Sequence, residues 1–154
     1  MQQNCKMGIS NLSPSSKIWI YKSNRELTSS EQAFIREELN LFIPQWASHG
    51  NQLFGGAEIL ENWFVVLAVD ETQSMASGCS IDTSVQFIKA LGKELNVDFF
   101  DRMHVLIENG NGKEQIHFSD IGKYPNSKIY NPLVTNLADF KRSWLIPVKE
   151  SQFA

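Results

Sequence analysis

The order of hydrophobic patterns along the chain predicts an α+β fold. Segments with the composition of strands and segments with helical periodicity follow one another as strand, helix, strand, strand, helix, strand. An apolar run at residues 63–69 predicts a strand buried on both faces, and an Asn-Gly-Asn-Gly stretch at residues 109–112 predicts a β-hairpin. We therefore expect a ferredoxin-like split βαβ sandwich (βαββαβ) with an added hairpin strand and a C-terminal extension.

The first strand and the first helix are marked by local signals. Residues 17–22, KIWIYK, are β-branched and aromatic, a composition that suits a half-buried strand. Thr28 and Glu31 stand three apart as a capping box at the start of a helix. Pro44 stops that helix at about Phe42, because proline lacks the N–H that another turn needs.

The middle of the chain predicts a pair of strands and a second helix. The two strands meet near Glu61 and Asn62, and the apolar character of the second, residues 63–70, places it at the centre of the sheet. From Ser80 or Asp82 onward, apolar side chains recur at helical spacing. The apolar positions of this helix are Ile81, Val85, Ile88, Leu91 and Leu95.

Two hairpin strands follow, with Glu108 opposite Lys113. One face, which we expect to be the core, carries Met103, Val105, Ile107, Ile116 and Phe118. The other face, which we expect to point away from the core, carries His104, Leu106, Gln115 and His117. Residues 134–144 then predict a short helix and residues 145–148 an edge strand, since proline in a strand is confined to edges. We expect this extension to cover the open face of the sheet.

The composition describes one globular domain preceded by an arm. The chain has 154 residues, 42% of them hydrophobic, which is enough for one buried core. Residues 1–16 are polar and lack periodicity, so we expect a flexible N-terminal arm before a single α+β domain at residues 17–154. A net charge of -3 without a basic cluster argues against nucleic acid as a partner.

The number and spacing of the cysteines and the hydropathy of the chain indicate the cellular compartment of the protein. Cys5 and Cys79 lie far apart in the sequence, and no signal-peptide pattern opens the chain. The longest apolar run has seven residues, against about 20 for a helix that crosses a membrane. We expect a reduced, cytoplasmic protein without membrane insertion.

The stretch SGCSID at residues 77–82 is the first candidate site. Cys79 stands where a loop turns into a helix, and the unpaired N–H groups and dipole of a helix start favour an anion and can activate a thiol. Gly78 allows close approach, and Ser80 or Asp82 can cap the helix. The competing interpretation is that Cys79 is a small buried residue, as free cysteines often are.

A nucleophilic Cys79 would need a base, and His49 is the best candidate in the sequence. His49 lies in the loop after the first helix. We expect the end of the first helix and the start of the second to lie at opposite ends of the sheet, which counts against contact between the two residues. The competing interpretation places His49 and Gly50 in a helix C-terminal cap.

Three further patterns have both a chemical and a structural interpretation. Asp70, at the end of the apolar strand, resembles the carboxylate that orients magnesium in an ATPase, but the sequence contains no G-x-x-x-x-G-K-[ST] loop, and a turn is the competing interpretation. His104 and His117 face each other and could bind a metal, but no third ligand is evident, and exposed histidines are the competing interpretation. The stretch DFFDRM, residues 98–103, contains Arg102 after acidic and aromatic residues. Its structural interpretation is a hydrophobic plug with a surface contact between Arg102 and an aspartate.

Five stretches, IWIYKSNREL, WASHGN, VLAVDE, SGCSIDTSVQFIK and DFFDR, resemble a family of small uncharacterised bacterial proteins, typical of Bacteroidota, that are often labelled ABC transporter ATPases. The resemblance covers most of residues 17–102 and implies nucleotide hydrolysis coupled to transport. The sequence departs from that label, because it has neither a phosphate-binding loop with its lysine nor an L-S-G-G-Q signature, of which ASGCSID is a faint echo. No functional residue is carried over from the resemblance.

The leading hypothesis is a small cytoplasmic domain that binds a small anionic ligand at the helix start. Its ligand-binding residues are Gly78, Ser80, Asp70 and Arg102. A second hypothesis is a cysteine-dependent enzyme or redox protein, without cofactor or metal, whose catalytic residues are Cys79, His49 and Asp82. A third is an ATPase, as the family label implies, and a fourth is a domain that forms a homodimer through exposed apolar faces.

Overall fold

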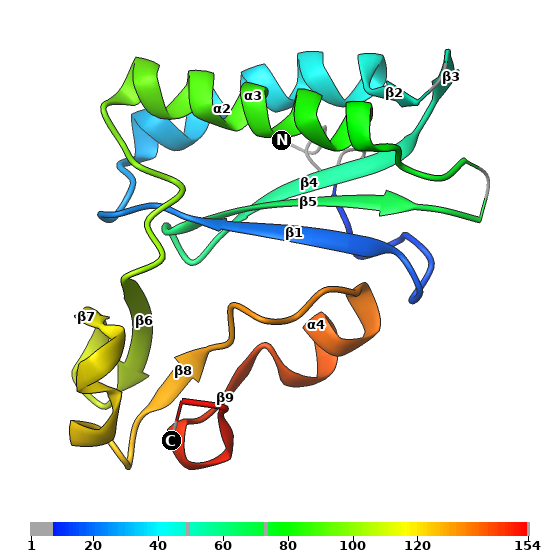
Figure 1. Cartoon of the computed structure of the whole chain (residues 1–154). Helices are drawn as coiled ribbons and strands as arrows, with labels where there is room; N and C mark the ends of the chain where they lie inside the picture. The colour runs from blue at the N-terminus through cyan, green and yellow to red at the C-terminus, as the bar shows by residue number, and fades with distance from the viewer. Residues whose placement is uncertain (1–7, 49, 73, 154) are drawn as a thin grey trace.

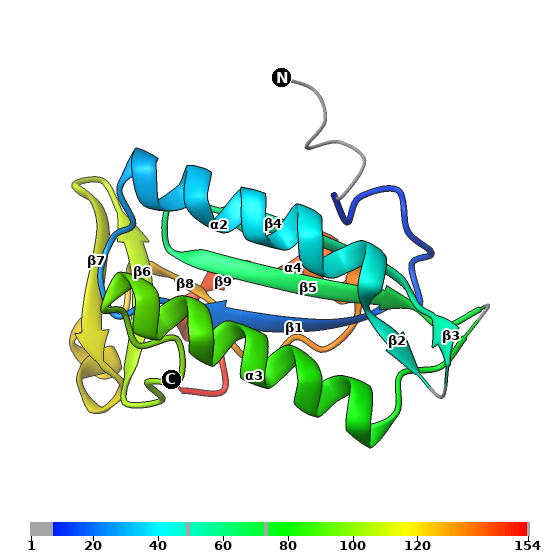
Figure 2. The same ribbon diagram turned by 90° about the horizontal axis from the view of Figure 1, so that it is seen from above.

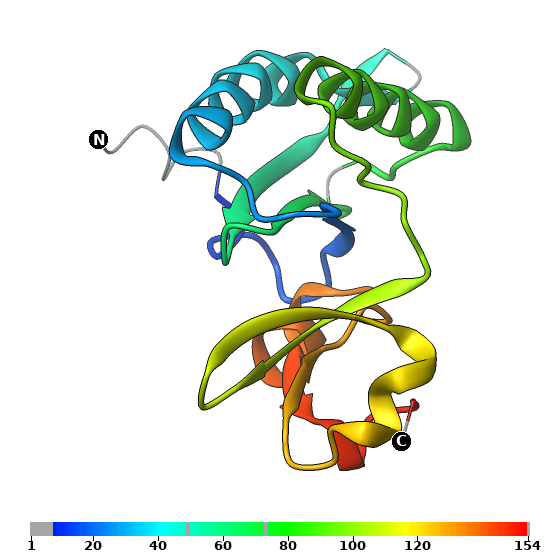
Figure 3. The same cartoon turned by 90° about the vertical axis from the view of Figure 1, so that its left-hand side faces the viewer.

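A computed structural model describes residues 8–48, 50–72 and 74–153 of the chain. The fold is α+β, as the sequence predicts, and its elements form three layers (Figure 1). Two long helices lie above a three-stranded sheet, and a second sheet with a short helix lies below it (Figure 3). The three-stranded sheet is therefore covered on both faces.

The first sheet consists of three antiparallel strands in the order β1-β5-β4. Their bounds are Lys17–Lys22 for β1, Phe54–Leu60 for β4 and Phe64–Asp70 for β5. All five residues from Val65 to Val69 have no exposed surface, which confirms the prediction of a central strand with two covered faces. β4 and β5 join at Glu61 and Asn62, whose φ angles of 58° and 65° are left-handed.

Helices α2 and α3 cover the upper face of this sheet (Figure 2). Their bounds are Ser29–Phe42 and Gly78–Leu95. Thr28 caps α2 through the predicted capping box with Glu31, and Pro44 lies in the 3-10 turn η1 (Ile43–Gln45) that follows. α3 begins earlier than predicted, because Ser77 rather than Ser80 or Asp82 is the N-cap. None of the helices in the described ranges is long and apolar enough to cross a membrane.

The upper core fills the space between these helices and the sheet. Its largest fully buried members include Ile35, Trp46, Leu67 and Ile88. Trp46 follows η1, at the point where β2 (Ala47–Ser48) pairs with β3 (Asn51–Gln52). The end of α2 is therefore anchored by a buried aromatic ring.

The second sheet contains four antiparallel strands in the order β7-β6-β8-β9. Their bounds are His104–Asn109 for β6, Gly112–His117 for β7, Lys128–Tyr130 for β8 and Leu145–Pro147 for β9. The hairpin predicted at Asn-Gly-Asn-Gly joins β6 to β7. Its register is also confirmed, since Glu108 lies opposite Lys113.

The ferredoxin-like sheet is not confirmed, because β6 does not join the first sheet. In that arrangement the strand after the second helix would lie beside β1. The outer edge of β1 is instead occupied by the C-terminal extension: Ile18 N–H donates to Thr135 O at 3.0 Å, and Lys17 forms a bridge with Asn136. β6 pairs with β7 and β8 below the first sheet.

Both faces of the second sheet contribute side chains to a core. The expectation that the face with Leu106 points away from the core is therefore wrong. Leu106 is 1% exposed and packs beneath the first sheet with Phe64 and Val66. The opposite face has its own core, formed by Val105, Ile107, Ile116, Ile121, Ile129 and Val148. Because side chains alternate along a strand, His104 and Gln115 lie on the face that carries Leu106.

The C-terminal extension covers the lower face of the first sheet, as predicted. The predicted helix is α4 (Leu137–Ser143), and the predicted edge strand is β9. Leu137 has no exposed surface and packs below the sheet with Tyr130. Two 3-10 turns complete this layer, η2 (Phe118–Lys123) and η3 (Val148–Glu150).

The N-terminal residues 8–16 are packed, so the expectation of a flexible arm is corrected for this part. Ile9 is 2% exposed and joins the core below the first sheet. Leu137 N–H donates to Ser16 O at 2.9 Å, and Ala138 N–H donates to Pro14 O at 2.9 Å. The rest of the expected arm, residues 1–7, lies outside the described residues.

Candidate functional site

The structure places Cys79 in the first turn of α3 with its side chain exposed. The interpretation of Cys79 as a buried residue is therefore wrong. Ser80 is 1% exposed and belongs to the cap: its N–H donates to Ser77 Oγ at 3.1 Å, and Ser77 N–H donates to Ser80 Oγ at 2.7 Å. Gly78 and Asp82 are exposed in the same part of the helix. The helix start presents a thiol to solvent, while Ser80 is committed to capping.

The end of α2 and the start of α3 lie at the same end of the sheet, because the two helices run antiparallel (Figure 2). Trp46 Nε1–H, just after α2, donates to Ser80 O at 2.9 Å. The expectation that these helix ends lie far apart is wrong, since the helices follow strands β1 and β5, which are antiparallel. His49, and with it any contact to Cys79, lies outside the described residues.

Asp70 stabilises the turn after β5. Its carboxylate accepts from Thr72 Oγ1 at 2.7 Å, from Thr72 N–H at 3.0 Å and from Ser13 N–H at 3.2 Å. The hydrogen bond from the Thr72 hydroxyl is the main reason why the pKa of Asp70 lies below its usual value. These contacts support the turn interpretation of Asp70 rather than a magnesium ligand.

Arg102 lies at the opposite end of α3 from Cys79. The helix has 18 residues, which corresponds to about 27 Å at 1.5 Å per residue. The expected pair between Arg102 and an aspartate is absent from the described residues, because Asp101 binds His104 instead and also accepts from Met103 N–H at 2.7 Å. The predicted ligand-binding residues are therefore not brought together in one place.

Other titratable side chains gather at this opposite end, and we call the group of Lys22, Asp101, His104 and His117 the histidine end. Asp101 Oδ2 lies 2.8 Å from His104 Nδ1, with exposed side-chain fractions of 16% and 39%. The rings of His104 and His117 lie 5.5 Å apart and at 85° to each other, from opposite positions of β6 and β7. The prediction that the two histidines face each other is confirmed.

Hydrogen bonds assign different roles to the two imidazoles. His117 Nδ1 accepts from Ser119 N–H at 3.2 Å, so the proton of the neutral ring lies on Nε2. In His104 a proton on Nδ1 points to Asp101, which leaves Nε2 as an acceptor. One ring offers a donor and the other an acceptor, an arrangement that does not suit a metal held by both. No three His, Cys, Asp or Glu side chains within the described ranges are placed to hold a metal ion.

Lys22 links β1 to this group. Its ammonium donates to Ser23 O at 2.8 Å and to Gln115 Oε1, and it lies 5.6 Å from the centre of the Trp63 ring. Burial lowers the pKa of Lys22 to about 8, and the charges of Asp101 and Asp98 oppose that shift. A half-buried amine with a lowered pKa thus lies close to the aspartate that holds His104.

Replacing Lys22 by methionine removes this titration. Because the folded-state pKa of about 8 lies below the ordinary 10.5, the unfolded chain binds more protons between these pH values. We therefore expect the free energy of unfolding of the wild type, relative to Lys22→Met, to be lowest below pH 8 and to rise between pH 8 and 10.5. Urea denaturation of both proteins below, within and at the top of this window measures the difference. A constant or falling difference would contradict the prediction.

Sequence reasoning found half of the histidine end. The hairpin register identified His104 and His117 as partners. Lys22 was missed because the last residue of a strand is usually solvated, and its partner Gln115 lies 93 residues away. Asp101 did carry a local signal, since an aspartate three residues before a histidine at a strand start can reach the ring.

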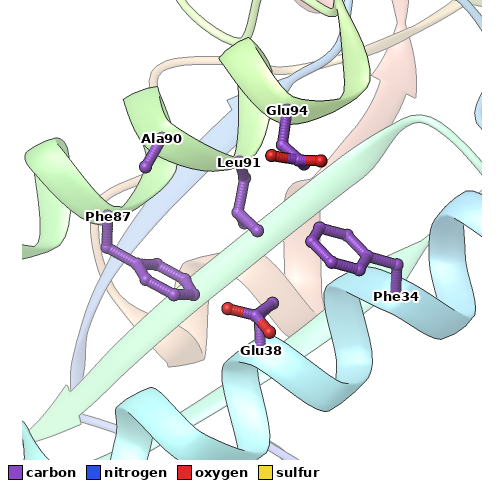
Figure 4. A pocket seen from close by; sticks show the side chains of 6 residues that line it. All are labelled: Phe34, Glu38, Phe87, Ala90, Leu91 and Glu94. Carbon is purple, nitrogen blue, oxygen red and sulfur yellow. The ribbon is translucent and has the colours of Figure 1, made fainter.

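A small cleft lies between α2 and α3 (Figure 4). Its volume is about 160 Å³, and its lining residues are Phe34, Glu38, Phe87, Ala90, Leu91 and Glu94. Two aromatic rings stand on opposite sides of Leu91, and a carboxylate from each helix borders the opening. This cleft is separate from both the helix start with Cys79 and the histidine end.

Fold and site together define a three-layer α+β protein with an Asp-His pair, a second histidine and a half-buried lysine at one end of its first sheet. Comparisons of the chain with family models, with curated proteins and with solved structures gave no match.

Proposed function

We propose that the protein binds a small acidic molecule, as its anion, at the histidine end. The observation that carries this proposal is the grouping of Lys22 with a donor ring, His117, and an acceptor ring, His104, that is held by a carboxylate. Titratable groups with a perturbed pKa and a specific charge partner are candidates for functional sites. The ligand class is the one expected from the sequence, and the location is different.

Each side chain has a role in such binding. Nε2 of His104 takes up a proton, from the ligand or from water where the ligand is already ionised, and the Asp101 carboxylate stabilises the imidazolium that forms. Nε2–H of His117 donates to an oxygen of the anion, and the positive charge of Lys22 adds attraction from the neighbouring strand. The site thus combines proton transfer with anion binding on one face of the second sheet.

A thermal-shift titration with phosphate, sulfate and acetate tests the proposal. An anion at a hundredfold excess over its Kd adds about 2.7 kcal/mol, which raises the melting temperature of a domain of this size by roughly 5 to 10 °C. His104→Asn keeps a donor toward Asp101 but lacks Nε2, and His117→Asn keeps an acceptor toward Ser119 but lacks the outer N–H. We expect each variant to lose most of the shift.

Cys79→Ala is the matched control at the other end of the first sheet, and it should retain the wild-type shift. A shift that survives in both histidine variants, or the lack of any shift with all three anions, would overturn the proposal.

The second candidate is anion binding or thiol chemistry at the start of α3. It is favoured by the exposure of Cys79 in the first turn of an 18-residue helix, where backbone N–H groups attract negative charge. The same titration separates the candidates, because an anion bound by these backbone N–H groups predicts a shift that both histidine variants retain in full.

A further inference from the structure

The cleft between α2 and α3 has two aromatic walls held in place by helix geometry (Figure 4). Its α2 residues, Phe34 and Glu38, are four positions apart, and its α3 residues follow helical spacing from Phe87, so each helix lines the cleft with one face. Leu91 is 3% exposed and forms the apolar floor. The Phe87 ring stacks on Phe42 at 4.3 Å, which fixes its orientation. The Phe87 wall is therefore preformed.

The cleft carries two carboxylates without internal counter-charges. Within the described ranges, Glu38 and Glu94 have neither an ion-pair partner nor a side-chain hydrogen bond. Two cationic side chains of this region are engaged elsewhere. Arg25 binds Glu31 at 2.7 Å, and Lys89 lies 5.8 Å from the centre of the Phe100 ring. The apolar hollow is thus bordered by negative charge alone.

We infer that this cleft binds a small organic cation of the alkylammonium class. Aromatic faces attract cations, and quaternary ammonium groups are recognised by aromatic side chains in this way. The carboxylates of Glu38 and Glu94 supply the complementary charge, while Phe34, Phe87 and Leu91 contact the alkyl groups. The volume of about 160 Å³ is close to the roughly 150 Å³ of an apolar cavity that holds benzene. A trimethylammonium group is of suitable size.

Choline and its neutral analogue 3,3-dimethyl-1-butanol test the inference, because they share a shape and differ in charge. Both are titrated against the 15N-labelled protein, with the amide signals of residues 34–42 and 87–94 as the readout. We expect choline to shift these signals at millimolar concentration, and the neutral analogue to bind roughly tenfold more weakly. Equal affinity of the two compounds, or the lack of any shift in these segments with choline, would overturn the inference.

Three isosteric variants locate the charge effect. Glu38→Gln and Glu94→Gln should each weaken choline binding several-fold, without changing the affinity for the neutral analogue. Glu37→Gln is the control, since Glu37 is exposed next to Glu38 and does not line the cleft. A loss in Glu37→Gln as large as that in the cleft variants would show only a general charge effect and would contradict the site. The amide spectrum of each variant reports whether it is folded.

Discussion

Replacing Trp46 with alanine is expected to lower the free energy of unfolding by about 3 to 5 kcal/mol. Trp46 is 1% exposed, and its ring lies 5.4 Å from Phe42 and 6.1 Å from Trp19. Its Nε1–H also donates to Ser80 O and so joins the end of α2 to the first turn of α3. The substitution leaves a cavity at the point where the two helices and the first sheet meet.

Trp46→Phe separates the two contributions of this residue. Phenylalanine keeps an aromatic ring and removes the donor toward Ser80 O, so we expect a smaller loss, about 1 to 3 kcal/mol. Urea denaturation followed by circular dichroism measures both variants without relying on the fluorescence of the residue that is replaced. If alanine costs less than phenylalanine, Trp46 does not fill the core as its burial indicates.

Gly92→Ala is expected to destabilise the protein, although alanine is the better helix former. In an unconstrained helix this exchange stabilises by about 1 kcal/mol. A Cβ atom at Gly92 would lie 2.5 Å from Val97 O, a backbone atom that moves only if the turn after α3 moves. That turn is tightly closed, because Val97 N–H donates to Gly92 O at 2.8 Å and Asn96 is left-handed. The net expectation is a loss of about 1 to 3 kcal/mol.

Gly78→Ala is the matched control in the same helix. A Cβ atom at Gly78 has no other atom within 4 Å, so the better helix propensity of alanine is unopposed and the change is neutral or stabilising by up to about 1 kcal/mol. Chemical denaturation of the two variants should therefore give effects of opposite sign, or a clear loss for Gly92→Ala alone. Equal effects would show that the turn after α3 adjusts freely to a methyl group.

Much of the local structure was predictable from short-range patterns. The Thr28 and Glu31 capping box, the stop near Pro44 and the hairpin with Glu108 opposite Lys113 all appear in the structure. α3 starts earlier than the sequence predicts, because Ser77 and Ser80 form a capping box in which a serine takes the position usually held by glutamate.

The candidate site was less predictable, because its residues come from four segments. Lys22 ends β1, Asp101 lies in the loop after α3, and His104 and His117 lie on β6 and β7. A sequence pattern can pair the two histidines through their hairpin. It does not show that this hairpin packs against the end of β1, where Lys22 lies.

The sequence by itself determined the three helices, the strands of the first sheet and the hairpin of β6 and β7, and that the central strand is buried on both faces, since caps, turns and periodicity act between near neighbours in the chain. The short strands β2, β3 and β8 carried no such signal. Only the tertiary structure decided that β6 joins a second sheet, because Thr135 and Asn136 occupy the edge of β1. The same packing brings Lys22 to Gln115 and so assembles the histidine end. Competition for a strand edge depends on residues more than a hundred positions apart, and no local pattern records it.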